Sequence, residues 1–396
     1  MKILMICKYP PIQGGVSAEC YWTAQLLSKM GHHVCVLTNA EEVEGEYRMN
    51  MTNKDRQLLT GFFTSDSVKV ISTNSDRKHV FVPQVNPSVS KLLSRGLEVL
   101  ESERPDIIWA HYLEPYGVVA YLLSEISGIP YIFRHAGSDI GRLMLTSGLQ
   151  MIHRQVLRNA TFIMTRQSHH DRFLDLDVPK ERLVDSFSTK LRSELFFPTP
   201  CTIQDPVVLG VYGKTGETKG TGVLLDALAI LKRDGLNIKL KAHWGGKDLS
   251  RYLYQIRELG LEDMVEVNDF IPHWHIPDFI RSCDAILFLE NRFKITFHQP
   301  SIPLEVVSCG RPVITTSEVA SKPLYDKLLV DGENAFIVEK EVGKDAVVET
   351  IKRAVSVLAT REEIMPVSTF AIPETQIRVR LHRFLEQIQI TIKERR

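Results

Sequence analysis

The sequence predicts an α/β protein built from two domains, each with a parallel sheet. Short apolar runs with the length of buried strands recur along the whole chain, and stretches with helical spacing separate them. This alternation of strand and helix is typical of parallel sheets, whose crossover connections are helices. A chain of 396 residues, of which 44% are hydrophobic, is long enough to form two such cores. We therefore expect two domains.

The first half of the chain alternates between strands and helices from its first residues. An apolar run opens the chain, a loop rich in Pro and Gly follows it, and Gly31 ends the helix after that loop. Residues 41–67 are polar and charged, which indicates an inserted loop. The expected strands are residues 2–7, 34–37, 68–70, 104–111, 130–133 and 161–164, and the expected helices are residues 16–30, 88–100, 117–127 and 144–158.

The second half repeats the same alternation from residue 207 onward. The helix expected at residues 303–309 is the best bounded, because a Pro suits its first turn and Gly310 suits its end. The expected strands are residues 207–212, 238–242, 264–267, 285–289, 312–315 and 335–338, and the expected helices are residues 223–232, 250–259, 276–282, 303–309, 344–359 and 375–393.

Composition argues against several classes of protein. The 48 basic and 48 acidic residues balance, so no net charge points to nucleic acid. The six cysteines are scattered without a Cys-x-x-Cys pair, and no cleavage site follows the N-terminal apolar run, so we expect a cytoplasmic protein with reduced thiols. No apolar run approaches the length of a membrane span. The neighbouring histidines His169 and His170, like His273 and His275, lack companion ligands, so we predict no metal site.

Two loops with glycines each precede a predicted helix. Gly14 and Gly15 follow the first strand, and Gly213-Lys214 opens a second loop that runs on through Lys219. Glycines let a backbone approach a phosphate or a sugar closely, and cations beside a helix N-terminus suit a diphosphate. Neither loop completes the dinucleotide or P-loop fingerprint. The alternative interpretation is a pair of tight turns, with solvated lysines in the second.

A carboxylate stands early in the helix expected at residues 303–309. Glu305 follows an apolar strand and a loop, and ligands of parallel sheets bind at the carboxyl ends of the strands. A carboxylate at this point can accept two hydrogen bonds from a ribose diol. The alternative is a carboxylate that is favoured there only by the helix dipole.

The sequence around Glu305 resembles the nucleotide-sugar loop of the retaining GT-B glycosyltransferases, the large family that contains many bacterial hexosyltransferases. Glu305, Gly310, Pro312 and Val313 match the second half of the family's pattern, whereas Phe297 stands where its first Glu is expected. The likeness extends over nearly the whole chain. It implies two Rossmann-like domains that face a cleft, with a C-terminal helix that crosses back to the N-terminal domain.

The resemblance implies a function for each domain. Residues 1–198, completed by residues 375–396, would bind the acceptor, and residues 199–374 would bind the donor, a nucleoside diphosphate sugar. The implied reaction transfers a hexosyl unit to an acceptor hydroxyl with retention of the anomeric configuration, and it needs neither a metal nor a cofactor. The acceptor would be a sugar, a glycoside or a lipid-linked glycan.

The resemblance also assigns site residues. The catalytic contacts would come from His135, near the reacting sugar, and from Lys214 and Lys219, which would neutralise the leaving diphosphate. Polar residues between positions 298 and 301 would read the donor sugar in place of the family's first Glu. The implied donor-binding set is Gly14, Gly15, Gly213, Lys214, Lys219, Ile271, His298, Gln299, Ser301 and Glu305.

Other interpretations stay open at this stage. The arginines between residues 134 and 172 are compatible with a phosphorylated acceptor or an anionic membrane surface, and also with an ordinary solvated face. A non-catalytic protein that binds nucleotide sugars would explain the departure at Phe297. A sugar-nucleotide epimerase with the same fold is the other rival, and the lack of a recognisable pair of catalytic carboxylates argues against it.

Overall fold

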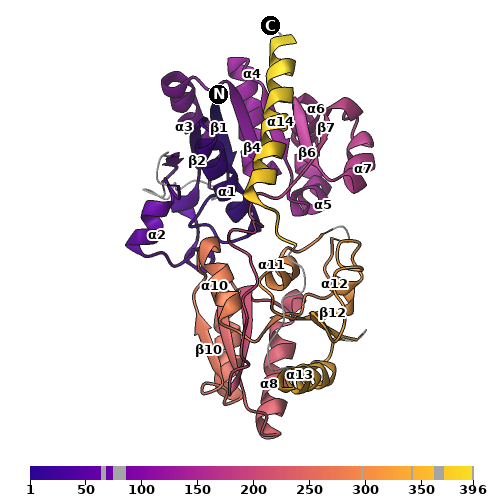
Figure 1. Cartoon of the computed structure of the whole chain (residues 1–396). Coiled ribbons are helices and arrows are strands. Elements are labelled where there is room, and N and C mark those ends of the chain that lie inside the picture. Colours follow the sequence, from indigo (N-terminus) through magenta and orange to yellow (C-terminus); the bar gives the residue numbers. More distant parts are fainter. Residues whose placement is uncertain (64–67, 75–85, 296–297, 340–341, 361–369, 395–396) are drawn as a thin grey trace. The chain divides into compact units, whose positions relative to one another are not determined.

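The chain forms two compact α/β units (Figure 1). The computed structural model describes residues 1–63, 68–74, 86–295, 298–339, 342–360 and 370–394. The first unit contains Met1–Glu44, Met51–Lys190 and Glu374–Arg396. The second unit contains Gly45–Asn50 and Leu191–Pro373. The C-terminal segment therefore returns to the first unit, as the resemblance implied.

The first unit is organised around a parallel sheet of seven strands in the order β3-β2-β1-β4-β5-β6-β7. The strand order reverses between β1 and β4, so this unit has the switch point of a doubly wound fold. The strands are β1 (Lys2–Cys7), β2 (His33–Thr38), β3 (Lys69–Ser72), β4 (Ile107–His111), β5 (Tyr131–Arg134), β6 (Phe162–Thr165) and β7 (Leu183–Asp185).

Helices of the first unit cover this sheet, and the last of them comes from the far end of the chain. Phe384 of that C-terminal helix packs with ring centroids 5.7 Å from Trp109 of β4 and 6.1 Å from Phe162 of β6. The helices are α1 (Gly15–Lys29), α2 (Asn53–Leu58), α3 (Ser88–Glu103), α4 (Val118–Ser127), α5 (Ser138–Arg142), α6 (Gln150–Asn159), α7 (His170–Leu174) and α14 (Glu374–Glu394).

Two expectations for the first unit need correction. The helix predicted at residues 144–158 begins only at Gln150, because residues 143–149 form two short 3-10 turns. The polar stretch at residues 41–67, expected as a loop, contains α2, whose N-cap Thr52 forms a reciprocal capping box with Asp55. Within the same stretch, Gly45–Asn50 belongs to the second unit.

The second unit repeats the doubly wound design with six parallel strands in the order β10-β9-β8-β11-β12-β13. Its switch point lies between β8 and β11, which are direct neighbours. The strands are β8 (Val207–Lys214), β9 (Ile238–Gly245), β10 (Val265–Asn268), β11 (Ala285–Phe288), β12 (Val313–Thr316) and β13 (Ala335–Val338). The helices are α8 (Thr221–Arg233), α9 (Leu249–Glu258), α10 (Ile276–Arg281), α11 (Ile302–Ser308), α12 (Ser317–Ala320) and α13 (Lys344–Ala359).

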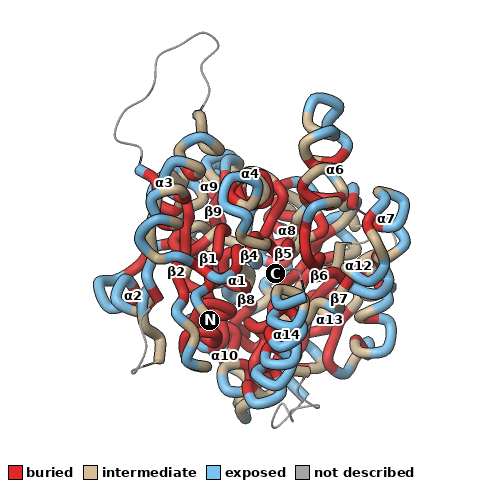
Figure 2. Tube along the Cα trace, turned by 90° about the horizontal axis from the view of Figure 1, so that it is seen from above, coloured by how far each residue is buried: buried red, intermediate tan, exposed pale blue. Residues whose placement is uncertain are grey.

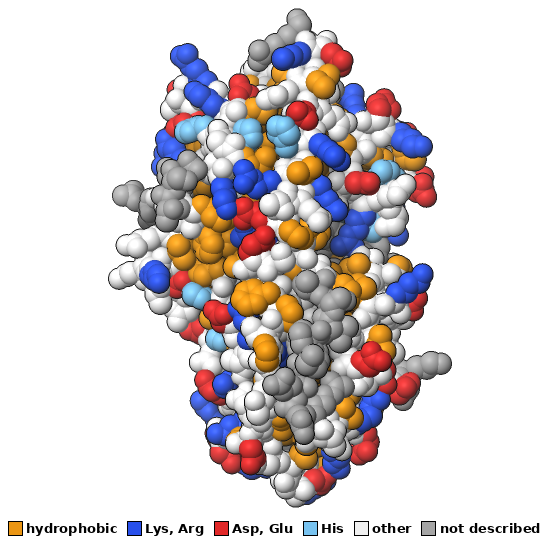
Figure 3. Space-filling model, viewed as in Figure 1, with side chains coloured by type: hydrophobic (Ala, Val, Ile, Leu, Met, Phe, Trp, Pro, Cys, Tyr) orange, Lys and Arg blue, Asp and Glu red, His pale blue; other side chains and the backbone are white. Residues whose placement is uncertain are grey.

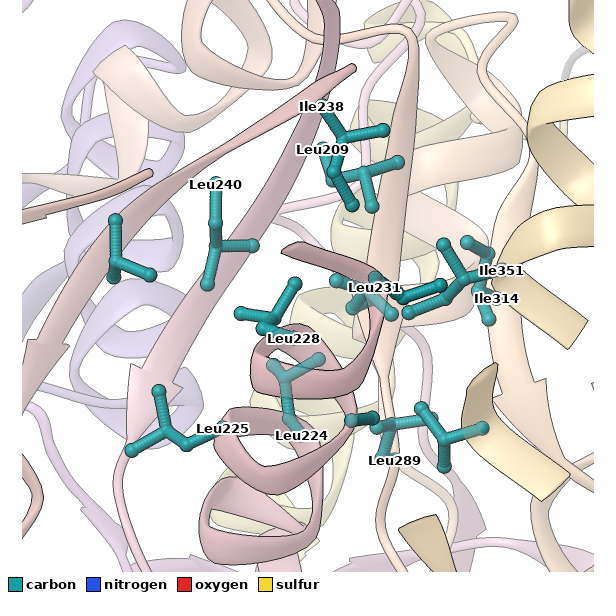
Figure 4. Close-up of a cluster of buried hydrophobic side chains, with 14 of the residues drawn as sticks. Leu209, Leu224, Leu225, Leu228, Leu231, Ile238, Leu240, Leu289, Ile314 and Ile351 are labelled. Carbon is teal, nitrogen blue, oxygen red and sulfur yellow. The ribbon is translucent and has the colours of Figure 1, made fainter. Parts of the chain in front are cut away.

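The apolar face of α8 anchors the core of the second unit (Figure 4). Leu224, Leu225, Leu228 and Leu231 recur at helical spacing on that face, and all four are buried. They pack with residues of β8, β9 and β12 and with Ile351 of α13. The central strands are buried on both faces, which is why their sequences are apolar runs without alternation (Figure 2).

The surface mixes charges of both signs. Acidic and basic side chains intermingle on the visible face of the molecule (Figure 3). Among the residues that the structure describes, no helix is both long enough and apolar enough to cross a membrane.

Candidate functional site

The carboxyl ends of β8 and β11 lie next to each other at the switch point of the second unit. Ligands of open α/β sheets bind at such points, because loops from neighbouring strands diverge there and helix N-termini face the opening. Tyr212, Gly213 and Lys214 end β8, and Glu290 follows β11 by two residues. We call this group of loops the second-sheet edge, and it holds most of the residues predicted for the donor.

The segment 213–221, which we call the lysine loop, comprises the end of β8, the turn after it and the first residue of α8, and it is tightly tied to its surroundings. The backbone N–H of Thr215 donates to the carbonyl oxygen of Gly245 at 2.9 Å, and the N–H of Gly216 donates to Oγ1 of Thr221 at 3.1 Å. Gly220 has φ +70°, and a Cβ there would come within 2.8 Å of the carbonyl oxygen of Leu289. Only glycine meets both conditions, so the loop is held directly against the segment that follows β11.

The first turn of α8 offers an environment for an anion. No side chain caps this helix, whose N-cap residue is Gly220, and the N–H of Thr221 donates to the carbonyl oxygen of Gly216 at 3.3 Å. The N–H groups that follow it in the first turn are left to solvent or a ligand. Lys219 lies immediately before the cap and forms an ion pair with the buried carboxylate of Glu290. Lys214 is exposed, with its Nζ 4.8 Å from the ring centroid of Tyr47. Both lysines therefore lie in the loop where the sequence predicted them.

Tyr47 reaches Lys214 because Gly45–Asn50 is packed on the second unit. The carbonyl oxygen of Glu46 accepts from the N–H of Gly246 at 2.7 Å, and the N–H of Asn50 donates to the carbonyl oxygen of Phe270 at 2.8 Å. Nothing in the residue pattern indicated this contact, because the polar composition of residues 41–67 only indicated a loop.

Glu305 of α11 is buried and already holds hydrogen bonds. The hydroxyl of Tyr212 donates to Oε2 at 2.8 Å, the hydroxyl of Ser301 donates to Oε1 at 2.9 Å, and Nε2 of His273 lies 3.5 Å from Oε1. Burial, followed by the charge of Glu305, raises the pKa of Tyr212 well above its ordinary value, so its hydroxyl stays a donor.

The predicted sugar-reading residues occupy different surroundings. Nε2 of His298 lies 3.6 Å from Oε1 of Glu290, and its ring stacks on Phe293 with centroids 4.5 Å apart. Gln299 is half-buried, and the hydroxyl of Ser301 is engaged by Glu305. Phe297, where the family's first Glu is expected, lies outside the described residues.

Ile271, which the resemblance assigned to the donor-binding set, follows a tightly packed phenylalanine. Phe270 is buried, and its ring would lie 2.3 Å from a Cβ placed on Gly245, the last residue of β9. Ile271 is half-buried and packs on the core around α10 and α11. Phe270 is therefore committed to its own fold, whereas Ile271 keeps part of its surface exposed.

In the first unit, His135 lies just past β5 and uses both ring nitrogens. The N–H of Gly137 donates to Nδ1 at 3.1 Å, so Nε2 carries the hydrogen and donates to Oγ1 of Thr165 at 2.7 Å. Burial, with His169 and Arg134 nearby, lowers the pKa of His135 to about 3. The imidazole is therefore neutral near pH 7, which makes it a positioned polar group rather than a cation.

Gly14 and Gly15 open α1, and a buried ion pair anchors this helix. Gly14 is the N-cap of α1, with φ +131°. Four residues into the helix, Glu19 accepts from the guanidinium of Arg134 at 3.1 Å and from the N–H of Thr189 at 2.6 Å. Burial alone would raise the pKa of Glu19, but these partners hold it below its ordinary value. The glycine pair is thus fixed at the carboxyl edge of the first sheet.

In the described part of the chain, no three His, Cys, Asp or Glu side chains lie together in a way that could hold a metal ion. The histidines that stand together in the sequence have other partners. His273 lies against Glu305 and Phe196, and the ring of His169 lies 5.8 Å from that of His135.

Comparison with known proteins identifies the family. A model of the glycosyl transferase 4-like domain matches residues 14–184, and a model of the glycosyl transferases of group 1 matches residues 199–364. The chain belongs to the GT-B glycosyltransferases. The two matches fall on the first and the second unit respectively, so both halves of the glycosyltransferase carry the family pattern.

Solved structures share the fold of this glycosyltransferase over nearly its whole length. HepE from Anabaena in complex with UDP and glucose is 17% identical, covers 98% of this chain and 100% of its own, and has a TM-score of 0.64. Sucrose-phosphate synthase from Thermosynechococcus elongatus is 14% identical, covers 98% of this chain and 99% of its own, and has a TM-score of 0.63.

Among curated proteins, an uncharacterized glycosyltransferase of Methanocaldococcus jannaschii is 23% identical over 378 residues, which are 92% of this chain and 90% of that protein. The O-antigen biosynthesis protein RfbC of Myxococcus xanthus is 30% identical over 155 residues. That stretch is 39% of this chain but only 11% of the Myxococcus protein, which is much longer.

Sequence reasoning missed two residues of the second-sheet edge. Tyr212 ends an apolar strand and gave no polar signal, although its hydroxyl holds Glu305. Glu290 stands in a charged run after β11 that is typical of an exposed loop, yet it is 1% exposed. Its partner Lys219 is 71 residues away in the sequence, so only the folded chain shows the pair.

Proposed function

We propose that this glycosyltransferase moves a hexosyl unit from a nucleoside diphosphate sugar to an acceptor hydroxyl with retention of the anomeric configuration. The observation that carries the proposal is the second-sheet edge, where an uncapped helix N-terminus with two lysines and a buried, hydrogen-bonded carboxylate meet at one switch point. The lysines and the helix N-terminus suit the diphosphate, and Glu305 suits the ribose.

Departure of the diphosphate is the difficult step, because negative charge grows on its oxygens as the sugar leaves. Lys214, Lys219 and the first N–H groups of α8 would stabilise that charge without a metal. The acceptor hydroxyl would attack from the same face of the sugar and pass its proton to the leaving phosphate. His135, neutral and held by Thr165, would position the reacting sugar from the first unit.

A thermal-shift screen with UDP, GDP, ADP and dTDP tests donor binding first. UDP is the leading probe, because HepE was solved with it. The second step incubates the protein with the matching nucleotide sugars and measures release of nucleoside diphosphate by slow hydrolysis. Release supports a transferase, whereas an altered sugar that stays attached to its nucleotide would indicate an epimerase. Binding without either reaction would favour the non-catalytic alternative.

The acceptor side of the proposal includes contact with an anionic membrane, compatible with a lipid-linked glycan acceptor. Leu145 and Met151 are 75% and 74% exposed, and the exposed Arg142 and Arg154 flank them in the chain. Apolar side chains between cations are typical of peripheral membrane surfaces. The wild type should sediment with vesicles in which a third of the lipid is anionic. Most of a Leu145→Asp, Met151→Asp variant should stay in the supernatant. Equal sedimentation of both would remove this part of the proposal.

A further inference from the structure

Glu290 is a buried carboxylate at the switch point of the second unit. It follows β11 by two residues, and β11 is the direct neighbour of β8, which leads into the lysine loop. Its side chain is fully buried, and a charge taken out of water is costly unless partners compensate for it. The partners of the two carboxylate oxygens therefore decide how far the cost of burying this charge is offset.

The two oxygens of this carboxylate have different partners. Oε2 holds the ammonium of Lys219, which the proposed function assigns to the diphosphate. Oε1 faces Nε2 of His298 at 3.6 Å, and His298 belongs to the segment assigned to the sugar. Glu290 therefore lies between the group expected to hold the diphosphate and the group expected to hold the hexose.

Oε1 is incompletely satisfied. Among the described residues it has no hydrogen-bond partner, although less than 1 Å² of its surface is exposed. A buried acceptor left in this state is costly, and native folds keep few of them. A hydroxyl donated by a ligand would remove that cost.

The segment after β11 is fixed rather than loose. The N–H of Asn291 donates to the carbonyl oxygen of Thr218 at 3.0 Å, which ties it to the lysine loop. The N–H groups of Arg292 and Phe293 donate to the carboxylate of Glu318 at 2.6 and 3.2 Å. The ring of Phe293 then lies beneath both Lys219 Nζ, at 5.0 Å, and the imidazole of His298. Glu290 is thus presented by a segment whose geometry is set before any ligand arrives.

We propose that Glu290 is a donor-specificity residue, whose carboxylate anchors Lys219 and offers Oε1 to a hydroxyl of the transferred sugar. This inference rests on the proposed function and adds the class of sugar to it. A fixed negative charge beside the sugar favours neutral hexoses, which donate hydroxyl hydrogen bonds, and disfavours sugars that carry a carboxylate of their own. The same charge competes with the diphosphate for Lys219, so it weakens binding of the nucleotide without a sugar.

The test compares UDP, UDP-glucose and UDP-glucuronate by calorimetry on the whole chain. Wild type should bind UDP-glucose at least tenfold more tightly than UDP-glucuronate. Glu290→Gln keeps the shape of the side chain and removes its charge, so its affinities for UDP-glucose and UDP-glucuronate should differ by less than threefold. The same variant should bind UDP as tightly as wild type or a few-fold more tightly. If Glu290 had only a structural role, its substitution would weaken the binding of all three ligands by a similar factor.

Two further variants separate the effect of the charge from the effects of side-chain length and of protein stability. Glu290→Asp retains the charge but shortens the side chain, so it should still reject UDP-glucuronate while it loses affinity for UDP-glucose. Asp284→Asn is the matched control, because Asp284 is also buried and stands at the opposite end of β11, with its oxygens occupied by the N–H groups of Val208 and Gln204. This control should lower stability and leave the ligand ratio unchanged.

The outcomes separate the two levels of the proposal. If wild type binds no nucleoside diphosphate, the proposed function fails and the role of Glu290 falls with it. If wild type binds UDP-glucose but accepts UDP-glucuronate equally well, or if Glu290→Gln keeps the wild-type ratio, Glu290 does not select the sugar, and the proposed function stands without it.

Discussion

At the scale of single residues, the site is built from polar groups whose partners fix their state. Glu305 is an example, because Tyr212 and Ser301 each donate to one of its oxygens and so hold the carboxylate oriented. His135 is the neutral counterpart in the first unit, since the N–H of Gly137 and the hydroxyl of Thr165 fix its tautomer. Each side chain is positioned before a substrate binds, which is what electrostatic catalysis requires.

Glu305→Gln should weaken nucleoside diphosphate binding by a few kcal/mol, because a charge-assisted contact to the ribose is lost. Calorimetry with UDP measures the change. Tyr212→Phe serves as the control, since it removes one donor to Glu305 but keeps the carboxylate, and its affinity should stay within about threefold of wild type. Unchanged affinity in Glu305→Gln would remove this residue from the donor site.

His135 should make the stability of the protein depend on pH. Its pKa is about 3 in the folded state, below the ordinary value of 6.5, so the unfolded chain takes up a proton first as the pH falls. The contribution of His135 leaves the free energy of unfolding undiminished above pH 6.5 and lowers it progressively toward pH 3. The loss between pH 7 and pH 5 is about 2 kcal/mol. Urea unfolding at pH 7 and pH 5 measures this difference in the free energy of unfolding, and His135→Gln should lack the contribution of His135 to it. A parallel decline in both proteins would contradict the assignment.

At the scale of elements, the lysine loop shows what the sequence could predict and what it could not. The glycine turn before α8 was predictable, because such a turn is local and needs glycine, whereas the diphosphate role of Lys214 and Lys219 stays a prediction. The partners of the two lysines were not predictable, because Glu290 and Tyr47 come from segments that are distant in the sequence. The start of α6 was also missed, since nothing in residues 143–149 separates a 3-10 turn from a helix by periodicity alone.

Lys214→Ala and Lys219→Ala should both lower turnover more than they weaken substrate binding, because their contacts strengthen as charge develops on the diphosphate. Their effects on stability should differ. Lys219→Ala leaves the buried Glu290 without its cation and should also lower the melting temperature, whereas Lys214 is exposed and its loss should not. Wild-type turnover in both variants would show that this loop does not hold the diphosphate.

At the scale of the whole molecule, the two units share the same doubly wound sheet design. Both units have a strand order that reverses beside their first strand, β1 or β8, so each has its own switch point and its own set of polar loop residues. This repetition was predictable from the alternation of apolar runs. The exchange of Gly45–Asn50 into the second unit was not, because its contacts are backbone hydrogen bonds that no residue type announces.

Donor binding should therefore stabilise the second unit by itself. We expect two transitions in calorimetric melting, which core variants can assign. Leu123→Ala in the first core and Leu228→Ala in the second should each lower the transition of their own unit, because buried leucines cost about 2–5 kcal/mol when truncated. UDP at a hundred times its Kd should add about 2.7 kcal/mol, and only to the transition that Leu228→Ala lowers. A shift of the Leu123→Ala transition would place the nucleotide on the first unit and reverse the roles proposed for the two halves.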